Sequence, residues 1–216
     1  MKLPTPPKMT LSTRQLTVAA ENIVAAQFAL SGFDVLEQAG RARSLYDLVV
    51  AEAGGMMKVT VHGCVDGFWN VVDSYLEPSQ DEAFSKCDFH HAIDMWLQRH
   101  GTNMTCCLVH FDSADLSGMP RIYLASGAEV AEKLHRNTEL LGDSALYEEY
   151  ELTDGDGNHT VESLPPQWRF SQARIAELMA MAGKPQLHFR FSEAAHCAGS
   201  ADVRLAADAQ YPPMMN

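Results

Sequence analysis

The pattern of apolar and polar positions along the chain predicts helices alternating with short strands. Apolar residues recur at three- and four-residue spacings over residues 17–30 and 87–100, which is typical of helices with one buried face. Ser126 and Glu129 form a capping box that predicts the start of a third helix. A fourth helix is expected over residues 171–181, because Gly183 and Pro185 follow it.

Short β-prone runs lie between these helices. Residues 45–50 and 56–61 are joined by Gly54 and Gly55, which predicts a hairpin. A second hairpin is expected to join residues 150–152 to 160–161. The remaining predicted strands cover residues 33–36, 68–72, 104–111, 121–125 and 187–191. The predicted fold class is therefore α/β (α+β), with a mixed β-sheet flanked by helices.

Asp47 is the one charged residue in the first hairpin strand. A carboxylate in a mostly buried strand loses hydration, and hydrogen bonds, a paired charge or a metal ion must offset that cost. Two interpretations stay open for Asp47. It is either a strand-end carboxylate that is hydrogen-bonded to a neighbouring segment or a functional acid.

The features around Asp47 follow a definite order. A helix carrying Glu21 is followed by a strand, a basic loop with Arg41 and Arg43, the strand Tyr-Asp-Leu-Val-Val and the strand Lys-Val-Thr-Val-His. This order resembles the core of the PD-(D/E)XK nuclease superfamily, the restriction-endonuclease-like fold that includes archaeal Holliday-junction resolvases. The resemblance implies such a core, with elements in the order αβββαβ, and a C-terminal α+β extension.

The resemblance also implies roles for individual residues. Asp47 matches the family's strand aspartate, Thr60 its second acidic position, His62 its lysine position, and Glu21 the helix glutamate of some members. Glu21 and Asp47 would then be the Mg²⁺ or Mn²⁺ ligands, with His62 as general base and Thr60 as a supporting oxygen. Arg41 and Arg43 would contact DNA phosphates, although pairing with surface acids is the better explanation when the two arginines are taken in isolation.

Two departures from the family pattern weaken this expected site. Thr60 offers a neutral oxygen where a hard cation requires an anionic ligand. His62 replaces a permanent positive charge with a group that titrates near neutral pH. Because the acid-x-Lys tripeptide is missing, the sequence predicts metal-dependent phosphodiesterase activity that is weakened or lost.

Composition and charge narrow the choice of partners. The chain has 216 residues, 46% of them hydrophobic, which is ample for a buried core. Its net charge of −12 opposes nonspecific binding to nucleic acid, because phosphate binding depends on Lys and Arg. Seven of the acids lie within residues 143–165, which contain no Lys or Arg, so a local basic groove elsewhere remains compatible with the sequence.

The five cysteines and nine histidines suggest neither a disulfide framework nor a zinc site. The cysteine count is odd and no C-x-x-C spacing occurs, which favours a reducing, cytoplasmic location. His90, His91 and His100 are not expected to bind metal, because adjacent helical residues point in different directions. The sequence has no apolar run of membrane-spanning length and no signal-peptide pattern, so no membrane association is expected.

The expected organisation is an N-terminal arm (1–16), a nuclease-like core (17–140), a C-terminal extension (141–191) and a weakly structured tail (192–216). Three functions remain open. The favoured one is an endonuclease-like protein with weakened or lost catalysis that binds DNA or a protein partner. The alternatives are an active Mg²⁺- or Mn²⁺-dependent DNA endonuclease that uses Glu21, Asp47 and His62, and a fold-only interaction module, for example a homodimer, that does not bind nucleic acid.

Overall fold

The fold was analysed in a computed structural model of the chain. The structure describes residues 11–37, 45–76, 88–112, 118–153, 157 and 159–183. The chain divides into two units, Met1–Pro185 and Gln186–Asn216, and all described residues belong to the first. The predicted strand over 187–191, the predicted tail over 192–216, Arg41 and Arg43 lie outside the described residues.

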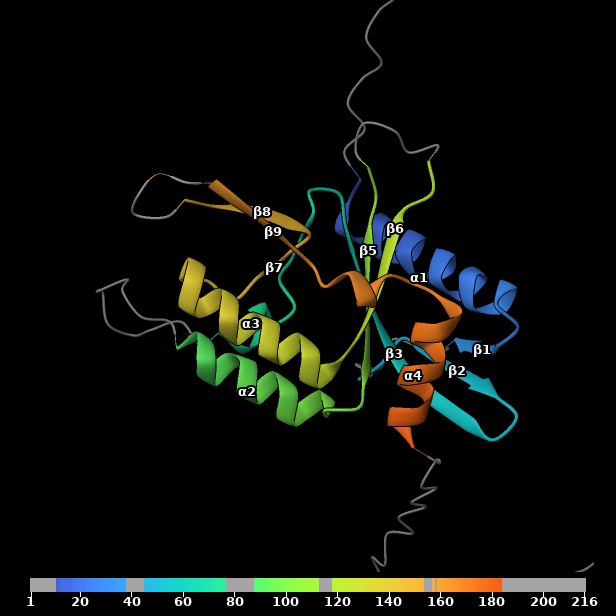
Figure 1. Ribbon diagram of the computed structural model, residues 1–216. Coiled ribbons are helices and arrows are strands. Elements are labelled where there is room, and N and C mark those ends of the chain that lie inside the picture. Colours follow the sequence, from blue (N-terminus) through green and yellow to red (C-terminus); the bar gives the residue numbers. More distant parts are fainter. Residues whose placement is uncertain are drawn as a thin grey trace, which may run out of the picture. The chain divides into compact units, whose positions relative to one another are not determined.

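A five-stranded mixed sheet forms the centre of the first unit (Figure 1). Its strand order is β1-β2-β3-β5-β6, and every neighbouring pair is antiparallel except β3 and β5, which are parallel. Parallel neighbours require a crossover connection, and α2 lies within the segment that joins β3 to β5. The strands span Asp34–Glu37 (β1), Leu48–Glu52 (β2), Gly55–Cys64 (β3), Thr105–His110 (β5) and Arg121–Ser126 (β6).

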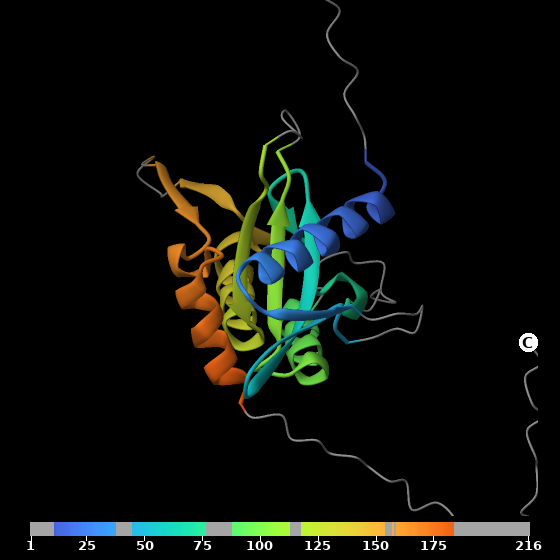
Figure 2. The same ribbon diagram turned by 90° about the vertical axis from the view of Figure 1, so that its right-hand side faces the viewer.

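Two pairs of helices cover the two faces of this sheet. Helices α1 (Thr13–Leu30) and α4 (Gln172–Ala182) pack on one face. Helices α2 (Phe89–His100) and α3 (Gly127–Leu141) pack against each other on the opposite face. Figure 2 shows α1 crossing in front of the strands, with α2 and α3 behind them. The structure thus confirms the predicted fold class, a mixed sheet flanked by helices.

Alternation along β3 divides its side chains between the two layers. Val59 and Val61 belong to the core beneath α1 and α4, whereas Cys64 belongs to the core beneath α2 and α3. Because successive strand residues point to opposite faces, Thr60 and His62 share the α2 and α3 side with Cys64. This parity places the two departures from the nuclease motif on one face of the sheet.

Helix α1 begins earlier than the sequence predicted. Ser12 is its N-cap and forms a capping box with Gln15, so the helix starts at Thr13 rather than near Thr17. Residues 13–16 of the predicted N-terminal arm are therefore helical. The other proposed domain boundaries remain predictions.

Helix α1 approaches β3 closely at Gly63. A Cβ atom at Gly63 would lie 3.0 Å from the Cβ of Ala20 and 3.3 Å from Cγ of Leu16. Only a residue without a side chain allows this approach without a shift of the helix. The contact fixes the part of α1 that carries Glu21 against the central strand.

Smaller elements complete the described chain. The predicted strand over 68–72 is shorter than expected, because β4 covers only Phe68–Trp69 and pairs with β7 (Leu146–Tyr147) rather than joining the central sheet. The αβββαβ order of the predicted core is therefore uninterrupted in that sheet. The second predicted hairpin is present as β8 (Glu149–Thr153) and β9 (His159–Ser163). Among the described residues, no helix is long and apolar enough to cross a membrane.

We expect Gly127→Ala to destabilise the fold. Gly127 opens α3, and a Cβ there would lie 2.4 Å from the backbone oxygen of Gly101. Relieving that clash costs about 1–3 kcal/mol, which exceeds the gain in helix propensity of at most about 1 kcal/mol. A net loss of up to about 2 kcal/mol should appear in urea denaturation.

Gly55→Ala is the matched control for this change. Its added methyl group would lie 3.7 Å from Cε of Met179, an ordinary van der Waals distance. If both variants unfold at the same urea concentration as the wild type, α3 does not approach the backbone of Gly101 closely enough to exclude a side chain at position 127.

Candidate functional site

Asp47 lies immediately before β2 and is held by the backbone of β3. Its N–H donates to the carbonyl oxygen of Val59 at 2.9 Å, and its Oδ2 accepts from the N–H of Val61 at 2.7 Å. The register pairs Leu48 with Val59, so extending it by one residue places Asp47 opposite Thr60. Asp47 and Thr60 are therefore neighbours across the sheet.

The bond to Val61 gives Asp47 a structural role. Just before the start of β2, the Asp47 carboxylate, rather than a backbone carbonyl, accepts a hydrogen bond from β3. Burial raises the pKa of Asp47, whereas the Val61 hydrogen bond and the charge of His100 lower it, with a net upward shift. A carboxylate with a raised pKa costs stability when it is ionised, which is common at functional sites.

Thr60 is buried and its hydroxyl is already engaged. Its Oγ1 donates to Sγ of Cys106, its partner residue on β5, at 3.5 Å. Burial raises the pKa of the Cys106 thiol to about 12, so this sulfur carries no charge at neutral pH. The Thr60 hydroxyl and the Cys106 thiol are thus two neutral groups that are bonded to each other in the core. Neither places a charge near Asp47.

His62 is neutral at physiological pH. Burial lowers its pKa to about 4, and repulsion from His100 adds to the effect. The carbonyl oxygen of His62 accepts a hydrogen bond from Nε1 of Trp69 at 3.0 Å, which ties this part of β3 to β4. A neutral imidazole can accept a proton, but it cannot replace the permanent charge of a lysine.

Glu21 is electrostatically coupled to Asp47. Burial raises the pKa of Glu21, and repulsion first from Asp47 and then from Glu37 raises it further. The structure therefore brings a helix glutamate into the field of the strand aspartate. Their roles as catalytic residues and metal ligands remain predictions.

His100 is a member of this group that the sequence analysis missed. It ends α2, and its charge influences both Asp47 and His62. Its Nε2 lies 3.1 Å from the hydroxyl of Tyr75, while its Nδ1 is buried without a hydrogen-bond partner of normal geometry in the described residues. No sequence spacing could reveal this proximity, because the crossover through α2 creates it.

Burial lowers the pKa of His100, and the nearby charge of Arg99 lowers it as well. The Leu45 backbone and the Asp47 carboxylate act in the opposite direction. The net shift of the His100 pKa is downward, so its charged form is disfavoured and it compensates Asp47 only in part.

The described side chains do not form a complete cation site. Within the described ranges, no three His, Cys, Asp or Glu residues are grouped in a way that could hold a metal ion. Asp47 already accepts a hydrogen bond from Val61, and Thr60 is bonded to a thiol. A hard divalent cation prefers several oxygen ligands with negative charge, so these residues fit Mg²⁺ or Mn²⁺ poorly.

No protein-family model matches the chain, and no curated protein matches it either. Among solved structures, a bacterial homing endonuclease is similar with a TM-score of 0.42 and 15% sequence identity, over 80% of this chain and 97% of that one. At this level of similarity, function has to be inferred from the residues of the chain itself.

The burial of His62 predicts a pH-dependent stability. In the unfolded chain His62 takes up a proton below pH 6.5, whereas in the folded chain it stays neutral until about pH 4. Folding stability should therefore fall as the pH drops from 6.5 to 4, by up to about 3 kcal/mol. In His62→Gln this part of the pH dependence should be absent.

The measurement is urea denaturation across that pH range. His91→Gln is the control, because His91 is an exposed residue of α2. The burial of His62 would be refuted by a His62→Gln variant that loses stability on acidification as steeply as His91→Gln.

Proposed function

We propose that the chain is a nuclease-like protein of the PD-(D/E)XK type, with weakened or lost phosphodiester hydrolysis and a remaining role in binding DNA. The placement of Asp47 carries this proposal. It precedes the second strand of an antiparallel meander, faces Thr60 on the third strand and repels Glu21 on the preceding helix. The parallel pairing of β3 with the strand after α2 supports the same αβββαβ core.

The chemistry of the three strand residues supports the loss of activity. A bound Mg²⁺ or Mn²⁺ would polarise the phosphate and lower the pKa of an attacking water. Asp47 instead accepts a backbone hydrogen bond, Thr60 is neutral and bonded to Cys106, and His62 is an uncharged imidazole. None of these groups adds a second negative ligand or a permanent positive charge.

The acidity of the chain constrains how DNA would bind. A protein with a net charge of −12 gains little from general attraction to phosphates. Binding must therefore depend on local donors that face the strand, and its salt dependence should be shallow. The same acidity supports a second candidate, an interaction module for a protein partner, which would show no affinity for DNA at any salt concentration.

We expect the purified protein to cleave neither linear nor branched DNA measurably in the presence of Mg²⁺ or Mn²⁺. The reason is the neutral Thr60 beside a single engaged aspartate. Gel assays over several hours are the measurement. Robust cleavage that is abolished by Asp47→Ala, but not by Asp34→Ala on the exposed start of β1, would establish an active endonuclease instead.

We further expect Thr60→Glu combined with His62→Lys to bind Mn²⁺ more tightly than the wild type or either single variant. The new carboxylate would stand opposite Asp47, and the lysine would return the missing charge. Groups that act as a unit are non-additive, so the double variant should exceed the sum of the singles.

Calorimetric titration with Mn²⁺ is the measurement for this double variant. Thr60 is buried, so circular dichroism must first show that each variant is folded. Equal Mn²⁺ affinities of the folded wild type and the folded double variant would mean that positions 47 and 60 do not share a cation site.

A further inference from the structure

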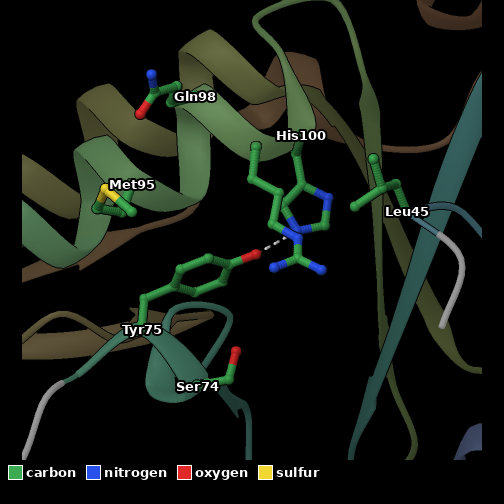
Figure 3. Close-up of a pocket in the computed structure, with 7 residues that line it drawn as sticks. Leu45, Ser74, Tyr75, Met95, Gln98 and His100 are labelled. Carbon is green, nitrogen blue, oxygen red and sulfur yellow. Dashed lines mark hydrogen bonds between the residues drawn. The ribbon is translucent and has the colours of Figure 1, made fainter.

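A pocket of about 630 Å³ opens at the C-terminal end of α2 (Figure 3). Its wall comes from the last two turns of α2, from the 3-10 helix Asp73–Tyr75 and from Leu45, which lies two residues before Asp47. A volume of this size is within the usual range for small-molecule sites. His100 belongs both to the pocket wall and to the group around Asp47 and His62.

The polar part of the wall is rich in hydrogen-bond donors. Arg99, Gln98 and Ser74 line the pocket as exposed residues, and Arg99 forms no ion pair with any described residue. Tyr75 presents its hydroxyl beside Nε2 of His100. In a protein with a net charge of −12, a guanidinium that has no acidic partner among the described residues and lies next to hydroxyl and amide donors is suited to a phosphate group.

The apolar part of the wall flanks these donors. Leu45 and Met95 are 40% and 42% exposed, respectively, and both line the pocket. Large apolar side chains that stay exposed beside polar donors can cover the flat face of a base or a sugar. This combination matches a nucleotide better than inorganic phosphate alone.

Arg99 has a second physical effect. Arg99 and His100 lie in the last turn of α2, where positive charges offset the negative end of the helix dipole. That effect stabilises the helix but does not depend on a ligand. A binding measurement therefore separates the two roles, because only ligand recognition changes with the phosphate group.

We propose that this pocket binds the terminal phosphate of a nucleotide, either free or at the end of a DNA strand. Arg99 is the main phosphate contact, and the Ser74 side chain supplies a further hydrogen bond. The Tyr75 hydroxyl can also donate to the phosphate when Nε2–H of His100 donates to its oxygen. The choice of a nucleotide rests on the proposed function, whereas the phosphate site rests on the pocket itself. His100 would then lie between the ligand and the group around Asp47, because it belongs to both the pocket wall and that group.

The first experiment is calorimetric titration of the full chain with deoxyadenosine monophosphate and with deoxyadenosine. The monophosphate should bind at least about tenfold more tightly, because the nucleoside lacks the charged hydrogen-bond acceptor. Arg99→Gln should remove about tenfold of the affinity for the monophosphate. Arg14→Gln, the same charge change at an exposed position of α1 on the opposite sheet face, should leave the affinity unchanged.

The second experiment distinguishes the two sources of the phosphate. Single-stranded oligonucleotides with a 5′-phosphate or a 5′-hydroxyl are titrated against wild type and Arg99→Gln. A strand end is the source if the phosphorylated strand binds more tightly and loses that advantage in the variant. A free nucleotide is the source if only the monophosphate binds in an Arg99-dependent way.

The two proposals fail in different ways. The pocket proposal is overturned if wild type binds no monophosphate, if deoxyadenosine binds equally well, or if Arg99→Gln behaves like Arg14→Gln. Duplex DNA with hydroxyl ends tests the DNA-binding function independently of the pocket. If the wild type does not bind this duplex but binds the monophosphate in an Arg99-dependent way, the DNA-binding role is refuted and the pocket proposal is supported.

Discussion

The parallel pairing of β3 with β5 is the constraint on which the candidate site depends. It forces the chain to cross through α2, so that the end of this helix returns to the start of β5. The crossover places His100 within the electrostatic field of Asp47 and His62, and the register places Cys106 against Thr60. Antiparallel pairing would have needed only a short turn, and α2 would not be required to return at this point.

The buried Glu148 and the half-buried Asp47 lie in very different electrostatic surroundings. Burial alone would raise the pKa of Glu148, but hydrogen bonds from Arg121, Tyr123 and His110 lower it to about 2. Within the described ranges, the Val61 N–H and the charge of His100 lower the pKa of Asp47, but burial outweighs them and the pKa stays raised. Glu148 is a structural acid with its charge fully compensated. Asp47 retains an electrostatic cost, which supports its selection as the functional candidate.

Local patterns sufficed for most of the elements. The capping box at Ser126 and Glu129, the Gly54-Gly55 turn and the apolar stripe of α2 each act over a few residues, and the structure contains all three. The start of α1 was misplaced because Thr17 and Ser12 are both acceptable caps. Only the reciprocal bond between Ser12 and Gln15 decides between them. Strand 68–72 was overextended because an apolar run does not reveal whether a neighbouring strand exists to pair with it.

The sequence by itself determined that Asp47 is exceptional and that the two strands form a hairpin. These properties follow from residue types and from a period of two, which neighbouring residues set. Only the tertiary structure decided that the Val61 N–H donates a hydrogen bond to the Asp47 carboxylate and that the Thr60 hydroxyl donates one to Cys106. It also decided that His100 lines a pocket. The two hydrogen bonds join residues 14 and 46 positions apart. Their geometry depends on strand register and on a crossover, which no local pattern encodes.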